Sequence, residues 1–151
     1  MGFLQETEML IYSSLKYEEI YMKISKDLKI TYKNIFLLCA ALGARTGRTV
    51  PVAKRGREFR ASYFNESEEN LVYTIILNDE TNGKNIELFN DSEFRKEARK
   101  IIEEYAEGGM DILVEEVFKE KWNGIKLDEK YDNYEVDIMK YLIANLNKVP
   151  F

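Results

Sequence analysis

Residues 31–51, TYKNIFLLCAALGARTGRTVP, carry the clearest structural signal in the chain. Thr31 is a good helix N-cap, because its hydroxyl can accept a hydrogen bond from a free backbone N–H of the first turn. The residues that follow, up to Gly43, are apolar on nearly every side of a helix, which is typical of a buried helix. Gly47 can end this helix in a left-handed conformation, and Pro51 prevents its regular continuation. We therefore expect a buried central helix that leads into a turn.

The pattern of residues 66–77 favours a helix, because it is longer than a usual strand. The β-branched run 72–77 leaves a buried strand as the alternative. Asn82 and Gly83 then predict a turn.

The strongest helical pattern opens with Asn90 and Glu93, which have capping-box spacing, and continues to about Trp122. Gly108 and Gly109 interrupt it, and two adjacent glycines cost about 1 kcal/mol each in a helix interior. They predict a kink, a tight turn or a close contact with another helix. A further helix follows a cap at residue 132 or 133.

The N-terminal part is less regular. Residues 6–14 predict a helix with an apolar side, whereas residues 16–28 fit a short strand and a helix equally well. Taken together, the patterns predict a mainly α fold. We expect one helical-bundle domain over residues 1–151, with room for a short β-hairpin.

Composition excludes several chemistries. The 151 residues include no histidine and only one cysteine, Cys39, so the chain alone cannot build a Ser-His-Asp site, a disulfide or a cysteine-rich metal site. Cys39 is expected to be a small buried core residue. The N-terminus lacks the pattern of a signal peptide, and the longest apolar run, residues 35–44, is too short to span a bilayer. We expect a cytoplasmic protein with no membrane segment.

Residues 45–60 form a basic segment in an otherwise acidic chain. Its six cations are Arg45, Arg48, Lys54, Arg55, Arg57 and Arg60. With Glu58 as the one acid, the segment has a net charge of +5, and the rest of the chain, with 16 basic and 26 acidic residues, has −10. Arginine matches phosphate oxygens in bidentate geometry, so we predict that this segment, a loop plus the first turn of the next element, contacts the DNA backbone. Docking of an acidic partner and pairing with the protein's own carboxylates are the alternatives.

Carboxylates recur every four residues along the late helix, at Glu103, Glu107, Asp111 and Glu115. They predict an exposed acidic face or a surface for a partner. A Mg²⁺ or Mn²⁺ site is the weaker alternative, because the four residues extend over more than three turns.

Three segments resemble one family. They are IFLLCAALG at residues 35–43, RTGRTVP at residues 45–51 and IEEYAEGGMDIL at residues 102–113. These segments are similar to an AAALG-like run, a basic RGRRVP-type turn and an EEYANGGLEIL-type helix in small DNA phosphorothioation-associated proteins, often called Dnd system-associated protein 4. The resemblance covers about residues 20–120, with Glu107 where the family tends to have Asn. It implies a role beside bacterial genome defence, where sulfur-modified DNA is made or recognised, and it implies no catalytic step.

We therefore predict a non-catalytic accessory protein of a DNA phosphorothioation or related anti-phage system, with no cofactor. The basic segment would contact DNA, phosphorothioated or plain, while Glu104, Glu107 and Asp111 would bind other subunits of the system. A protein–protein adaptor without DNA affinity is one alternative. A metal-dependent nuclease subunit that uses Glu103, Glu104 and Asp111 is another. Homo-oligomer formation is left open.

Overall fold

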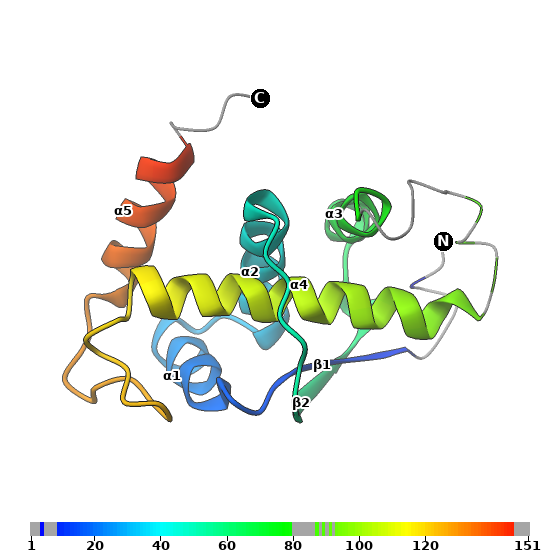
Figure 1. Ribbon diagram of the computed structural model, residues 1–151. Coiled ribbons are helices and arrows are strands. Elements are labelled where there is room, and N and C mark those ends of the chain that lie inside the picture. Colours follow the sequence, from blue (N-terminus) through cyan, green and yellow to red (C-terminus); the bar gives the residue numbers. More distant parts are fainter. Residues whose placement is uncertain are drawn as a thin grey trace.

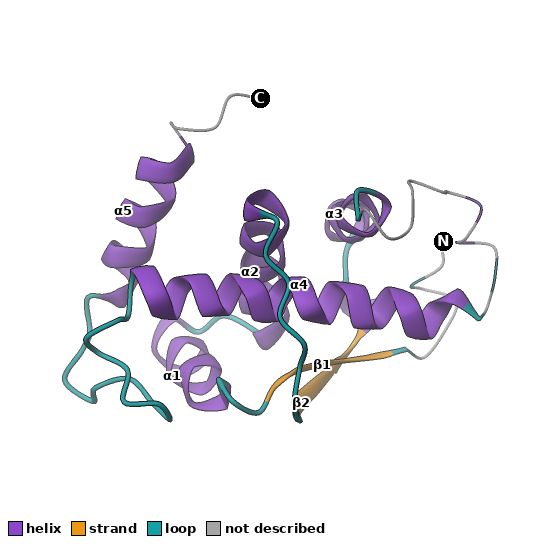
Figure 2. Ribbon diagram, in the orientation of Figure 1, coloured by secondary structure: helices purple, strands orange, loops and turns teal. Residues whose placement is uncertain are grey.

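The computed structural model describes residue 4, residues 9–79, residues 87, 89 and 91, and residues 93–146. Within this part of the chain, five α-helices accompany one two-stranded antiparallel sheet, so the mainly α prediction is confirmed (Figure 2). In chain order the elements are β1 (Leu10–Ser14), α1 (Glu18–Leu28), α2 (Tyr32–Thr46), β2 (Arg55–Arg60), the 3₁₀ helix η1 (Ala61–Tyr63), α3 (Glu66–Leu77), α4 (Phe94–Glu116) and α5 (Tyr134–Leu146).

The crossing of α2 and α4 organises the core. Figure 1 shows α4 running across the molecule with α2 behind it. The two backbones lie so close that a Cβ added at Gly109 would overlap the carbonyl group of Cys39, and one at Gly43 would overlap the carbonyl of Tyr105. The close contact with another helix is confirmed at Gly109, whereas Gly108 lies against the backbone of Arg48, beyond the end of α2. The tight turn and the kink are wrong, because α4 is continuous through both glycines and runs straight in Figure 1.

The predicted caps of α2 are both confirmed, since the Thr31 side chain accepts from the Asn34 N–H and Gly47 ends the helix at φ 71°.

Residues 47–54, the crossing segment between α2 and β2, pack against α4 on the side opposite α2 (Figure 1). The chain then passes in front of α4 on its way to β2 (Figure 1). There the Val50 N–H donates to the Glu104 carbonyl at 3.1 Å, and only a glycine fits at position 108 against the backbone of the crossing segment.

The pairing of β1 with β2 corrects two predictions. Residues 10–14, expected to be helical, form a strand whose Leu10 lies opposite Arg60 and whose Ile11 lies opposite Phe59. The second half of the basic segment is the partner strand and not a helical turn. The burial of Ile11 and Phe59 stabilises this strand pair. Because the two strands are far apart in the sequence, no local sequence pattern predicts their pairing.

Both ambiguous segments are helices. Residues 18–28 bury Ile20, Tyr21 and Ile24 on one side, so the helical alternative is the correct one. Residues 66–77 form α3, which begins with a full capping box: the Asn65 side chain accepts from the Glu68 N–H, and the Glu68 side chain accepts from the Asn65 N–H, each at 2.9 Å. The strand alternative for residues 72–77 is therefore wrong.

The ends of α4 differ from the prediction. The helix stops at Glu116 rather than near Trp122, and Glu93 precedes it without a side-chain capping bond. The predicted cap Asn90 and the predicted turn at Asn82 and Gly83 lie outside the described residues.

The last helix begins directly after Asn133, as predicted. Its apolar residues are only partly buried: Ile138 is buried, but Val136, Met139 and Ile143 are each about half exposed. In the described part of the chain, none of the helices has the length and apolar character needed to cross a bilayer.

Candidate nucleic-acid interface

β2 brings most of the basic segment to the surface. Four cations at or beside the strand are exposed: Lys54, Arg55, Arg57 and Arg60. The Arg55 guanidinium stacks 4.4 Å from the centre of the Tyr12 ring, and that of Arg57 stacks 4.6 Å from the Tyr32 ring. Stacking orders these side chains, and in Arg57 a hydrogen bond to the Tyr32 side chain adds to it. The guanidinium N–H groups that stacking leaves at the edge can donate to phosphate oxygens. Among the described residues, no ion pair within 4 Å involves any of the four cations.

Arg48 lies in a different environment. Its guanidinium donates to Asp111 at 3.0 Å and to Glu115 at 2.6 Å, and hydrogen bonding to Glu115 is the main cause of a raised Arg48 pKa. For this residue the structure supports the internal-pairing interpretation. Arg48 thereby ties the crossing segment to the C-terminal half of α4.

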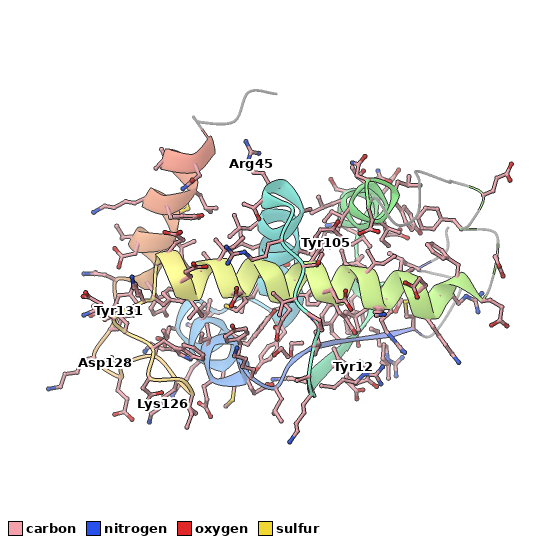
Figure 3. The ribbon with its side chains drawn as sticks, in the orientation of Figure 1. Tyr12, Arg45, Tyr105, Lys126, Asp128 and Tyr131 are labelled. Carbon is pink, nitrogen blue, oxygen red and sulfur yellow. The ribbon has the colours of Figure 1, made fainter. Side chains whose placement is uncertain are left out.

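Arg45 is remote from β2. It lies at the end of α2, on the far side of α4 from Tyr12 (Figure 3). There it borders an apolar groove between α2, α3 and α5 that Leu42, Leu71 and Leu142 help to line. The six predicted DNA-binding residues are therefore split among three places: Arg45 at the end of α2, Arg48 beside α4, and the other four at or beside β2.

The structure adds three cations that sequence analysis missed. Lys96, Arg99 and Lys100 of α4 border a groove of about 380 Å³ together with Arg55 at the start of β2. Pro51, Val52, Glu103 and Glu104 complete its lining. The sequence does contain a signal, a cluster of four cations at residues 95, 96, 99 and 100, which places like charges four residues apart.

Glu103 lies beneath these cations and faces inward. Its carboxylate accepts the Tyr12 backbone N–H at 2.8 Å, and its side chain is buried. Burial raises the Glu103 pKa, while the Tyr12 bond and the charges of Arg99 and Arg55 act in the opposite direction. Glu103 therefore fixes β1 against α4 and partly neutralises the two arginines beside it.

Glu107 is also buried, with only 4% of its surface exposed. Burial raises its pKa to about 7, opposed by a hydrogen bond with the Ser14 side chain and by the charge of Lys16. The expectation that Glu107 belongs to an exposed acidic face is therefore wrong. The cause is β1, which covers this side of α4 and brings polar groups to meet the carboxylates.

The remaining carboxylates are partly accessible. Asp111 accepts from the Tyr17 hydroxyl at 3.2 Å as well as from Arg48, Glu104 is half-buried, and Glu115 is exposed. Within the described ranges, no group of three or more His, Cys, Asp or Glu side chains is arranged to hold a metal ion. Glu103, Glu104 and Asp111 do not form such a group.

The comparison with protein families gives one result. A family model described as DNA sulphur modification system-associated protein 4 matches residues 17–128, which include every element from α1 to α4. No curated protein sequence and no solved structure matches the chain.

Proposed function

The chain belongs to the DNA sulphur modification system-associated protein 4 family, and on that premise we propose that it is a non-catalytic accessory protein that contacts DNA phosphates through β2. The observation that carries the proposal is the group of four exposed cations at or beside β2, two of them stacked on tyrosine rings. Phosphate contacts position a protein on DNA and need no base-specific groups.

The charge distribution supports DNA contact through β2. The protein has a net charge of −5, so DNA is repelled by most of its surface and attracted by the basic one. Such an asymmetry steers an encounter to one face. The acidic remainder suits contacts with other components of the sulphur modification system, and the exposed Glu115 and Glu116 at the end of α4 belong to it.

The test is fluorescence anisotropy with two short duplexes, one phosphorothioated and one plain, at several salt concentrations. We expect the wild-type protein to bind, with a log–log salt slope of about −0.9 for each phosphate neutralised. The variant Arg55→Glu/Arg57→Glu/Arg60→Glu removes three contacts and should lose binding.

A matched control is Lys119→Glu/Lys130→Glu/Lys140→Glu, which makes the same change in net charge at three exposed lysines that follow α4 in the chain. Equal losses in the two variants would indicate a general effect of net charge and contradict a β2 interface. If the wild-type protein binds neither duplex near physiological salt but retains a partner subunit in a pull-down, the adaptor function replaces the proposed one.

A further inference from the structure

The charges of α4 are arranged against the helix dipole. Its first seven residues contain four cations, Arg95, Lys96, Arg99 and Lys100, and its last turn contains no basic residue. The N-terminus of a helix has a positive partial charge and the C-terminus a negative one, so cations are stabilising at the opposite end. This distribution opposes the stability of the isolated helix.

The four cations also repel one another. Arg95 and Arg99 lie four residues apart, as do Lys96 and Lys100, and like charges at this spacing destabilise a helix. Among the residues that the structure describes, Lys96, Arg99 and Lys100 take part in no ion pair within 4 Å. Glu103 offsets Arg99 only in part, because its carboxylate is buried and already accepts the Tyr12 N–H. An external anion would relieve this repulsion.

Tertiary structure adds a further cation to the cluster. The groove of about 380 Å³ between β2 and α4 has Arg55 on one side and Lys96, Arg99 and Lys100 on the other. Arg55 is also one of the four exposed cations at β2, so the groove and the strand share this residue.

We infer that this groove seats the DNA backbone, with Arg55, Arg99 and Lys100 neutralising phosphate groups that pass from β2 onto α4. The inference rests on the proposed function and adds to it a second element, one that the basic segment of the sequence does not contain. The binding surface is therefore two-sided, with a strand and a helix that contact neighbouring phosphates.

The experiment compares Arg99→Gln/Lys100→Gln with the wild-type protein in duplex-binding titrations over a range of salt concentrations. Loss of two phosphate contacts should reduce the magnitude of the log–log slope by about 1.8 and weaken binding at every salt concentration. The control Lys119→Gln/Lys140→Gln changes the net charge equally at exposed sites and should leave the slope unchanged. Because Arg99 lies beside Glu103, the second variant Lys96→Gln/Lys100→Gln tests the groove without changing that neighbour.

The outcomes separate the two proposals. If the wild-type protein binds, the β2 variant fails to bind and both α4 variants keep the wild-type slope, the groove inference is overturned while the proposed function stands. If the wild-type protein does not bind the duplex, the proposed function fails, and the inference fails with it. A reduced slope in both α4 variants, with an unchanged slope in the control, supports the inference.

Discussion

The two halves of α4 have charges of opposite sign and use them in opposite ways. In the C-terminal half, Glu107 is buried beside Ser14 and Asp111 pairs with Arg48, so these carboxylates interact within the fold. In the N-terminal half, Lys96 and Lys100 are exposed, and the charges there are available to a ligand.

The contrast shows that sign and spacing alone do not reveal what a charged helix face does. Both halves repeat charges at four-residue intervals. Their neighbours differ: in the acidic half, Ser14 of β1 lies beside Glu107 and Arg48 of the segment after α2 pairs with Asp111, whereas in the basic half Lys96, Arg99 and Lys100 border a groove. The consequence is that changes in the acidic half should affect stability, and changes in the basic half should affect binding.

The largest effect on stability is expected at Gly109, in the C-terminal half of α4. In Gly109→Ala the new methyl group would overlap the backbone of Cys39, and neither helix can shift without disturbing the core. We expect a loss of about 3 kcal/mol or more in the free energy of unfolding, measured by urea denaturation. Glu97→Ala, at an exposed position of the other half, should change the same quantity by less than about 0.5 kcal/mol. Similar losses in the two variants would remove the contrast between the halves.

The pH dependence of stability tests the buried carboxylate directly. The Glu107 pKa is raised from 4.5 to about 7, so the folded state binds this proton more tightly than the unfolded state. The stabilisation from this proton is therefore fully present below about pH 4.5 and is lost as the pH rises through about 7, by on the order of 3 kcal/mol.

Glu107→Gln, which retains hydrogen-bonding capacity without the titration, should remove this part of the pH dependence. Chemical denaturation at pH 5 and pH 8 provides the measurement, and the difference between the wild-type protein and the variant isolates Glu107 from the other titrating groups. An unchanged pH dependence in the variant would show that Glu107 does not titrate in this range.

The smallest effect is expected at Arg48. Its partners Asp111 and Glu115 are partly exposed, so Arg48→Ala should cost less than about 1 kcal/mol in thermal denaturation. Because its guanidinium is engaged with these carboxylates, the variant should also keep the salt slope of duplex binding. A slope reduced by about 0.9 would assign a phosphate contact to Arg48 and extend the binding surface to the C-terminal half of α4.

The parts of the structure that sequence analysis predicted are those that depend on neighbouring residues. The caps at Thr31 and Gly47 and the helix over residues 66–77 are local, and all three are correct. The β1–β2 pair depends on contacts such as Ile11 with Phe59, between distant parts of the chain, and no local pattern reveals it.

The site shows the same limit. The basic segment draws attention to Arg55, but its proximity to Arg99 follows only from the packing of β2 beside α4. Likewise, the spacing of Glu103 and Glu107 places both on one side of a helix without showing that β1 covers that side. The like-charge pairs at residues 95–100 are the sequence signal that could have pointed to the α4 side of the proposed DNA-binding surface.

The most direct test of the division within α4 is an NMR titration of the ¹⁵N-labelled protein with a short duplex, which reports on both halves at once. We expect chemical-shift changes at residues 95–100 and along β2, and little change from Glu107 to Glu116. Changes concentrated between Glu107 and Glu116, or no changes along α4 while the duplex binds, would contradict the account.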